Sequence, residues 1–228
     1  MKSKSSKRFK KLLELIKDRK VENIDSAIEK VKKNCTSKFD ESIDISLLLN
    51  LKSKKKEEIN LRTIVNLPNG NGKKIKIAVL CEESKIKEAK DSGAEIAGSE
   101  NLVNDITSGK INFDKLIATP AMMPKMGKLG KILGPKGLMP NPKLGTVTND
   151  VKSTVTSIKT GQVEIKSDRD GNVGTSIGKK SFSNAKIKQN FDALLQTILK
   201  DKPNNIKGNF ILSAFLTSTM GISYKLKI

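Results

Sequence analysis

Two kinds of hydrophobic periodicity occur in the first part of the chain. Apolar residues at helical spacing predict helices over residues 7–18 and 26–33, and Ser26 and Glu29 have the spacing of a capping box at the start of the second helix. Residues 42–49 alternate for the most part between apolar and polar side chains, which predicts a strand that is buried on one face. A charged loop over 52–58 and a strand over 61–67 complete this part.

A different pattern follows the sequence Pro-Asn-Gly-Asn-Gly at 68–72, which is predicted to form a turn and a hinge. Short apolar runs alternate from there on with helical patterns. Strands are predicted over 75–81, 95–97 and 116–118, and helices over 83–92, 100–108 and 150–158. Strands and helices that alternate at this spacing are typical of a small parallel α/β layer.

The last part of the chain, from residue 160 on, has the pattern of antiparallel strands and one long helix. The turn-forming residues 168–172 lie between two short apolar segments and therefore predict a hairpin. The predicted elements are strands over 163–166 and 173–177, a helix over 184–200 capped by Ser183 or Asn184, and strands over 209–217 and 223–226. Antiparallel strands with helices on one face indicate an α+β domain.

Charge is unevenly distributed over these parts. The chain has 44 Lys and Arg residues against 24 Asp and Glu residues, a net charge of +20. Residues 67–159 carry a net charge of +6, which leaves +14 for the two flanks. If the flanks fold together, the middle is an insertion into a strongly cationic domain. Such an excess opposes compact folding unless an anion neutralises it, so nucleic acid is the expected partner and an anionic membrane surface the alternative.

Composition argues against several other classes of protein. No run approaches the roughly 18 apolar residues of a membrane-spanning helix. Residues 1–20 could form a membrane-surface or import segment, but a basic amphipathic helix is favoured because an apolar signal core is missing. Cys35 and Cys81 have no CxxC partner, which fits a reducing cytoplasm. The chain has no histidine, the commonest general base and metal ligand, so no metal, cofactor or catalytic site is expected.

Residues 127–143 alternate glycine, proline and lysine with leucine and methionine. The backbone N–H and ammonium groups of such a loop can bind phosphates. The segment is not a P-loop, because Pro135 and Lys136 stand where Gly-Lys-Ser/Thr is required. Two interpretations stay open, namely a rigid surface loop packed on its own domain and a loop that faces RNA.

This segment resembles the signature of the ribosomal protein L1 family, G-(R/K)-I-L-G-P-(R/K)-G-L-M-P-N-P-K-x-G-T-V, which residues 130–147 reproduce almost residue by residue. Further motifs extend the resemblance over essentially the whole chain. They are K-F-D-E-S at 38–42, Asp114 with A-T-P at 118–120 and Met122-Met123, Ser181-Phe182, and T-S-T-M-G at 217–221. The chain departs from the family pattern at Ile222, Leu212 and Gly174, where proline, arginine and histidine are frequent.

The resemblance implies an α/β two-domain fold. An α+β RNA-binding domain would comprise residues 1–67 plus 160–228, and an inserted Rossmann-like three-layer α/β domain would comprise residues 68–159. The implied function is that of a structural, non-enzymatic component of the large ribosomal subunit in the cytoplasm. It would bind the mobile ribosomal RNA stalk near the tRNA exit site, assist release of deacylated exit-site tRNA, and repress its own operon messenger RNA. Off the ribosome the protein is expected to be a monomer.

By position, the resemblance assigns RNA contacts to Lys38, Phe39, Ser42, Lys166, Lys179, Ser213, Thr217, Thr219, Met220 and Gly221. The lysines would neutralise phosphates, Phe39 would pack on ribose or base, and the hydroxyl residues would meet 2′-hydroxyls. Met220 would fill an apolar gap, and Gly221 would allow close approach of the backbone. The structural alternatives place Phe39 in the core, use Met220 for packing and leave the lysines as solvated surface charges.

Two other functions are weaker alternatives. A nucleotide-dependent enzyme would need a glycine fingerprint after the first strand of the middle part, where Glu82-Glu83-Ser84 would instead repel phosphate. A free DNA-binding protein would need a recognisable DNA-binding motif such as a helix-turn-helix, and the chain has none, with an aromatic content of only 4%. RNA binding is therefore the favoured hypothesis.

Overall fold

The computed structural model describes residues 6–14, 21–51, 61–203, 206 and 208–227. The chain divides into two compact units, residues 1–72 with 163–228 and residues 73–162. The sequence placed these boundaries at 67/68 and 159/160. Both boundaries fall a few residues later in the structure. Asn69 and Gly70 stay with the first unit because they hydrogen-bond with its residue Asn190. Residues 15–18 of the first predicted helix and the predicted charged loop 52–58 lie outside the described residues.

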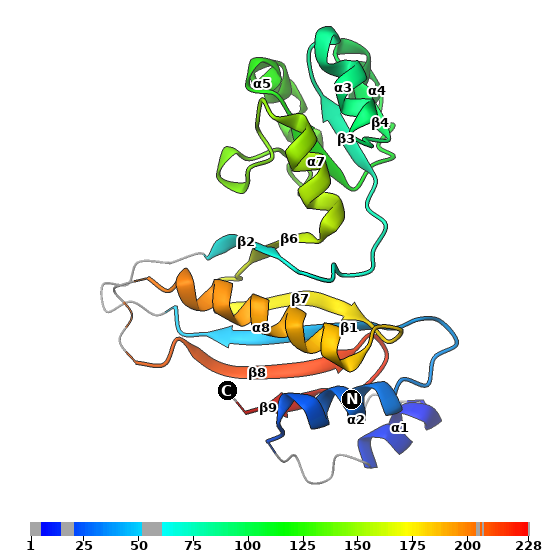
Figure 1. Ribbon diagram of the computed structural model, residues 1–228, viewed down its shortest axis with the longest axis vertical. Helices are drawn as coiled ribbons and strands as arrows, with labels where there is room; N and C mark the ends of the chain where they lie inside the picture. The colour runs from blue at the N-terminus through cyan, green and yellow to red at the C-terminus, as the bar shows by residue number, and fades with distance from the viewer. Residues whose placement is uncertain (1–5, 15–20, 52–60, 204–205, 207, 228) are drawn as a thin grey trace. The chain divides into compact units, whose positions relative to one another are not determined.

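The first unit is built on a four-stranded antiparallel sheet in the order β7-β1-β8-β9 (Figure 1). Its strands are β1 (Ser42–Leu49), β7 (Asn172–Lys179), β8 (Ile211–Ser218) and β9 (Tyr224–Leu226). The strand β1 is central, and its Ile45 lies opposite Thr175 of β7 and Leu216 of β8. Strands from both ends of the chain therefore pair directly with each other.

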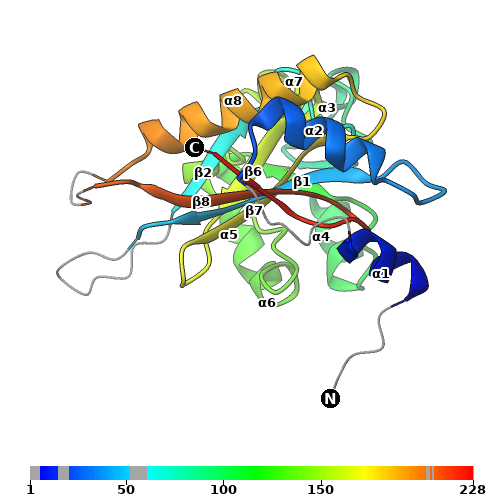
Figure 2. The same cartoon turned by 90° about the horizontal axis from the view of Figure 1, so that it is seen from below.

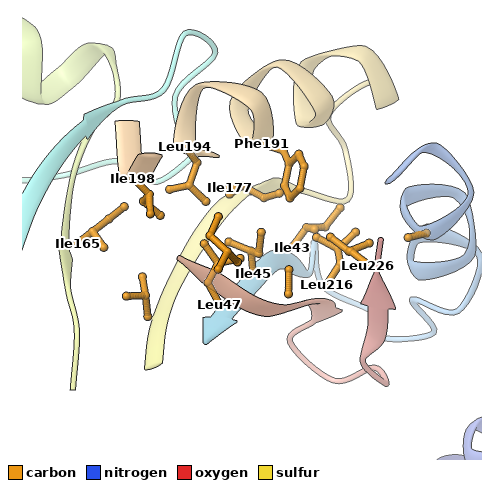
Figure 3. Close-up of a cluster of buried hydrophobic side chains, with 14 of the residues drawn as sticks. Ile43, Ile45, Leu47, Ile165, Ile177, Phe191, Leu194, Ile198, Leu216 and Leu226 are labelled. Carbon is orange, nitrogen blue, oxygen red and sulfur yellow. The ribbon is translucent and has the colours of Figure 1, made fainter. Parts of the chain in front are cut away.

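Two helices, α2 (Ile24–Lys33) and α8 (Asn184–Lys200), cover the same face of this sheet (Figure 2). The predicted period-two burial of β1 is confirmed, because Ile43, Ile45 and Leu47 are buried beneath α8 (Figure 3). The long helix is also confirmed, and Ser183 caps it by accepting a hydrogen bond from the Lys186 N–H. Apolar burial on this face is the main stabilising contribution to the unit.

The predicted hairpin around residues 168–172 is confirmed at its tip, where Ser167 and Val173 form an isolated antiparallel bridge, but it is wrong for the two strands. The strand β6 (Gln162–Lys166) pairs with β2 (Arg62–Asn66) in a separate two-stranded sheet, whereas β7 pairs with β1. The turn itself is present, since the Asp168 carboxylate accepts hydrogen bonds from the N–H groups of Asp170 and Asn172. Beyond it the strands diverge because pairing with distant strands buries more apolar surface than the local pair would.

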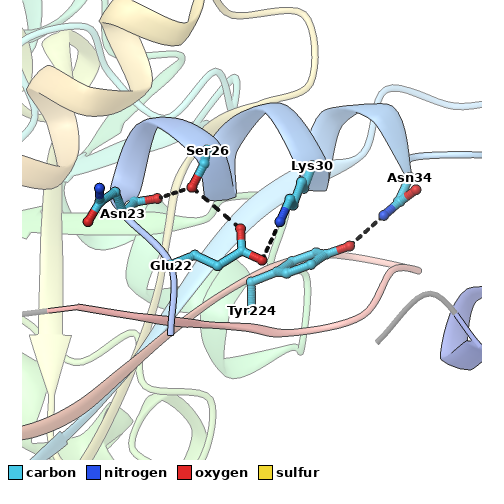
Figure 4. A network of polar contacts seen from close by, with 6 residues as sticks. All are labelled: Glu22, Asn23, Ser26, Lys30, Asn34 and Tyr224. Atoms are coloured by element: carbon cyan, nitrogen blue, oxygen red, sulfur yellow. Dashed lines mark hydrogen bonds and ion pairs between the residues drawn. The ribbon is translucent and has the colours of Figure 1, made fainter. Parts of the chain in front are cut away.

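The predicted capping box is also wrong. The helix α2 begins at Ile24, so Ser26 lies inside its first turn and donates to the Asn23 carbonyl at 2.9 Å (Figure 4). Glu22 forms an ion pair with Lys30 at 2.6 Å. The helix starts earlier than the serine suggested because Ile24 packs against the core, and burial outweighs a local capping preference.

The second unit contains a three-stranded parallel sheet in the order β4-β3-β5, which confirms the predicted parallel layer. Its strands are β3 (Ile77–Leu80), β4 (Ile96–Gly98) and β5 (Lys115–Ala118). Its helices are α3 (Ile86–Asp91), α4 (Glu100–Thr107), α5 (Met123–Met126), α6 (Gly130–Leu133) and α7 (Val151–Thr160). Alternate β3 residues face two separate apolar clusters, Ala78 and Leu80 on one side and Ile77 and Val79 on the other.

The glycine- and proline-rich segment is more ordered than the predicted loop. It contains the helical turns Gly127–Leu129, α6 and Pro142–Leu144, and it buries Leu129, Leu133 and Leu144. A Cβ at Gly134 would lie 2.6 Å from the Gly130 carbonyl oxygen, so this turn needs glycine. The interpretation as a segment packed on its own domain is therefore correct for its apolar residues, while its lysines are exposed.

Candidate nucleic-acid interface

Three segments that are distant in the sequence meet at one end of the four-stranded sheet. Ser42 begins β1 and lies opposite Lys179, the last residue of β7. The neighbouring Ile43 lies opposite Ser218, the last residue of β8. The loop 36–41 that precedes β1 and the turn 219–221 that follows β8 are therefore adjacent. We call the residues Lys38, Phe39, Ser42, Lys179, Thr217, Thr219, Met220 and Gly221 the end cluster.

The end cluster exposes two large apolar side chains. Phe39 is 53% exposed and Met220 is 47% exposed, so neither belongs to the core, and the structural alternative for Phe39 is wrong. Lys38 is exposed beside Phe39. Exposed apolar side chains next to a cation form a surface that can pack on ribose or base while the ammonium group meets phosphate.

The face of the sheet opposite the helices continues this surface. Ser42, Asp44, Ser46 and Leu48 of β1 are partly or fully exposed on that face, because every second side chain of the strand points away from the core. The neighbouring β8 places Thr217 opposite Asp44, Phe215 opposite Ser46 and Ser213 opposite Leu48.

Sequence reasoning missed three residues of this face. Phe215 is half-buried there, and Lys225 of β9 lies opposite it. Ser46 is exposed on β1 beside Phe215. The alternation of β8 itself could have identified Phe215, since it lies midway between Ser213 and Thr217 at a spacing of two.

Two of the predicted contacts lie away from the end cluster. Ser213 faces the same side of the sheet but pairs with Leu48, near the other end of β1. Lys166 is the last residue of β6, in the separate two-stranded sheet, and the turn that follows it leads to the start of β7. An RNA that touches both positions must therefore extend along the strands rather than bind at one point.

The polar groups of Thr219 and Gly221 serve contacts within the protein. The Thr219 hydroxyl accepts from the Ser42 N–H at 3.0 Å and lies 3.3 Å from the Ser42 carbonyl oxygen, so it closes the junction between β8 and β1. A Cβ at Gly221 would collide with the Ser218 hydroxyl, so any larger residue there would displace that side chain. The Thr219 hydroxyl therefore has a structural role at this junction, and as an exposed group it keeps one acceptor lone pair for a further contact.

The helix α1 (Lys7–Glu14) lies against the end cluster, a contact that the sequence did not predict. The Arg8 guanidinium donates to the Met220 carbonyl at 3.0 Å and to the Thr36 hydroxyl at 2.9 Å. A pocket of 380 Å³ separates the helix from the turn and is lined by Ser6, Arg8, Phe9, Thr219, Met220 and Gly221. The basic residues of α1 thus add positive charge beside the predicted contacts.

Two acids of the K-F-D-E-S motif fix the loop that carries Lys38 and Phe39. The Asp40 carboxylate accepts from the Ser181 N–H at 3.1 Å and from the Ser181 hydroxyl at 2.8 Å. Glu41 is fully buried and accepts from the N–H groups of Ser37 and Met220. Burial alone would raise the pKa of Glu41, but hydrogen bonds from Ser218, Ser37 and Met220 outweigh it and lower the pKa below its usual value.

Other kinds of site find little support in the described part of the chain. There, no three His, Cys, Asp or Glu side chains are grouped as a metal ion would require. Within the same residues, no helix combines the length and apolar character that crossing a bilayer demands. The free thiols of Cys35 and Cys81 are buried, and burial raises the pKa of both.

The comparisons with known proteins agree with the motifs. Residues 31–222 match the model of the Ribosomal protein L1p/L10e family. The chain belongs to this family. It is 57% identical over 224 residues to the large ribosomal subunit protein uL1 of Pelagibacter ubique, covering 98% of this chain and 97% of that protein. The uL1 protein of Synechococcus sp. is 45% identical, in an alignment that covers 99% of this chain and 95% of that protein. The uL1 protein of Rickettsia akari is 40% identical, in an alignment that covers 100% of this chain and 95% of that protein.

As a member of the L1 family the chain is a structural ribosomal protein of the cytoplasm and not an enzyme. The glycine- and proline-rich signature and all ten predicted contacts lie inside the matched residues. The helix α1 lies outside them, although alignments with the uL1 relatives extend over nearly the whole chain. The contact of Arg8 with Met220 thus joins a segment outside the matched residues to one inside them.

Proposed function

We propose that this large-subunit ribosomal protein binds the mobile ribosomal RNA stalk near the tRNA exit site through the end cluster and the open face of its four-stranded sheet. The observation that carries the proposal is the exposure of Phe39 and Met220 on adjacent loops, beside Lys38. Such side chains can pack on ribose or base while the neighbouring ammonium group neutralises a phosphate. The names of the uL1 relatives, which assign them to the large ribosomal subunit, support RNA as the partner.

Each group of the proposed interface has a separate role. Lys38, Lys179 and, farther along the strands, Lys166 neutralise phosphates without reading sequence. Phe39 and Met220 pack on ribose or base edges, which favours a folded RNA with an accessible minor groove or unstacked bases. The hydroxyls of Ser42, Ser213 and Thr217 meet 2′-hydroxyls. Asp44 lies among them and repels phosphate, so the backbone of the RNA must follow the lysines and avoid this position.

Two further activities are part of the proposal. The second unit exposes Lys128, Lys131, Lys136 and Lys143 on its glycine- and proline-rich segment, and this basic surface would contact exit-site tRNA and assist its release. If the messenger RNA of the protein's own operon folds like the stalk, it would bind the same end cluster. Excess free protein would then repress translation of that messenger RNA. Off the ribosome we expect the protein to be a monomer.

Binding to a stalk RNA fragment should weaken steeply as salt concentration rises. If three lysines contact phosphates, the logarithm of the affinity falls with the logarithm of salt concentration with a slope of about −2 to −3. Lys38→Ala should reduce the magnitude of this slope by about 1, whereas Lys200→Ala, at the exposed end of α8, should leave the slope unchanged. Filter binding at four salt concentrations measures both. A flat salt response of the wild type, or equal affinity for an unrelated RNA or DNA duplex, would contradict the proposal.

Thr219→Val should weaken stalk RNA binding by about 1–3 kcal/mol, because the Ser42 N–H loses its acceptor and the junction that holds Met220 loosens. The free energy of unfolding should fall by only about 1 kcal/mol. Filter binding and urea denaturation give the two values. The control is Thr197→Val, which removes a helix hydroxyl from α8 and should leave RNA affinity unchanged. Wild-type affinity of Thr219→Val would place the interface elsewhere.

A further inference from the structure

Glu41 occupies an unusual position for a carboxylate, directly beneath the end cluster. Its relative exposure is 0%, although the surrounding loop is polar and its neighbours Lys38, Phe39 and Asp40 are exposed. Burying a carboxylate is unfavourable unless several donors satisfy it. Here the Ser37 N–H donates to Oε1 at 3.0 Å and the Met220 N–H donates to Oε2 at 3.2 Å, with the Ser218 hydroxyl as a third partner.

These donors belong to two segments that are separated by most of the chain. Ser37 precedes Lys38 and Phe39, and Met220 is itself an exposed residue of the end cluster. One carboxylate thus joins the loop 36–41 to the turn 219–221 through the backbone of each. The side chains of Phe39 and Met220 project from the segments that Glu41 holds.

A cation completes this arrangement from the other side. Arg8 donates to the Met220 carbonyl at 3.0 Å and to the Ser37 hydroxyl at 3.4 Å. The backbone of Met220 is therefore held at its N–H by an anion and at its carbonyl by a cation. Charge-assisted hydrogen bonds are about twice as strong as neutral ones, so the position of this residue is well defined before any RNA binds.

We propose that Glu41 is a positioning residue for RNA binding, which fixes Phe39 and Met220 in the geometry that the stalk RNA requires without touching the RNA itself. This inference rests on the proposed RNA-binding function. A flexible loop and turn would have to be ordered at the moment of binding, and that ordering would reduce affinity. A carboxylate suits the role because it only accepts hydrogen bonds, and the N–H and hydroxyl groups around it donate.

The test compares Glu41→Gln with a variant whose defect lies elsewhere in the same unit. Glutamine keeps the size of the side chain but points an amide NH₂ at groups that donate. We expect stalk RNA affinity to fall about tenfold or more, because hydrogen bonds to a charged group are lost, while the slope of affinity against salt stays at the wild-type value. Ile198→Ala, which creates a cavity near the C-terminal end of α8, should lower thermal stability but leave the RNA affinity of the folded protein unchanged.

The inference would be overturned if folded Glu41→Gln bound stalk RNA with wild-type affinity. It would also be overturned if affinity fell and the slope of log affinity against log salt concentration changed by about one, because Glu41 would then influence a phosphate contact. If Glu41→Gln does not fold, Glu41→Asp replaces it. Aspartate keeps the charge but is one methylene too short to reach Ser37 and Met220 together, so its affinity should also fall, and wild-type affinity would again overturn the inference.

Lys38→Ala, measured in parallel, distinguishes failure of the positioning role from failure of the proposed function. If Lys38→Ala lowers the salt slope as expected while Glu41→Gln has no effect, only the positioning role of Glu41 is refuted. If the wild-type protein does not prefer stalk RNA over unrelated duplex, the proposed RNA-binding function is refuted.

Discussion

Asn190→Leu is expected to lower the free energy of unfolding of the first unit by about 3–5 kcal/mol. Asn190 lies in α8 with no exposed surface. Its amide group donates to the Gly70 carbonyl at 2.8 Å and to the Ile177 carbonyl at 2.7 Å, and its oxygen accepts from the Asn69 N–H at 3.1 Å. Leucine has a similar volume but no polar group, so all three backbone groups lose this partner, and the Ile177 carbonyl loses it inside the core.

Urea denaturation followed by far-UV circular dichroism measures this loss. The matched control is Gln189→Ala, one residue earlier on the same helix, which removes an exposed hydrogen bond to Asn69 and should change stability by about 0.5 kcal/mol or less. Equal stability of wild type and Asn190→Leu would mean that the turn 68–72 does not depend on α8. Because this turn leads into the second unit, the variant should also alter proteolytic cleavage near Gly70.

Leu47→Ala is expected to destabilise the first unit by about 3–5 kcal/mol, because it leaves a cavity in the core of the four-stranded sheet. Leu47 is fully buried on the central strand β1, beneath α8 (Figure 3). The adjacent Leu48 faces the opposite side of the strand and is only half-buried. Leu48→Ala should therefore cost about 1 kcal/mol or less.

The two leucine variants test the central structural claim about the interface, that one face of the sheet is core and the other is available to RNA. Chemical denaturation gives both free energies, and filter binding gives the affinity of each folded variant. A comparable loss of stability for Leu48→Ala would show that a further layer covers the open face. In that event the hydroxyl residues of that face could not meet RNA.

The comparison of sequence and structure is instructive at the K-F-D-E-S motif. Resemblance to the L1 family predicts its exposed members, Lys38 and Phe39, as RNA contacts. The buried role of Glu41 could not be read from the sequence, because isolated acids are almost always solvent-exposed and its donors lie in part at the opposite end of the chain. Arg8 was missed for the same reason, since its partner Met220 is 212 residues away.

Thr219 shows a different limit of sequence reasoning. Its position in the T-S-T-M-G motif was sufficient to predict it as an RNA contact, but not to predict that its hydroxyl also bonds to the Ser42 backbone. A hydroxyl near a proposed interface can bond either to the ligand or to the backbone beside it, and composition does not distinguish these cases. The register of β1 against β8 decides the question, because it brings the Ser42 N–H within 3.0 Å of the hydroxyl.

The sequence by itself determined the family, the positive charge of the two flanks, the parallel strands of the middle part, the long helix of residues 184–200 and the alternating burial of β1. These features depend on local periodicity or on motifs within one segment, which a linear reading captures. Only the tertiary structure decided that β6 and β7 enter different sheets, that α2 begins before its serine, and that Glu41 and Arg8 hold the backbone of Met220 from two sides. Each of these depends on a partner that is far away in the chain, and the free energy of burying and hydrogen-bonding distant groups outweighs the local preference that the sequence displays.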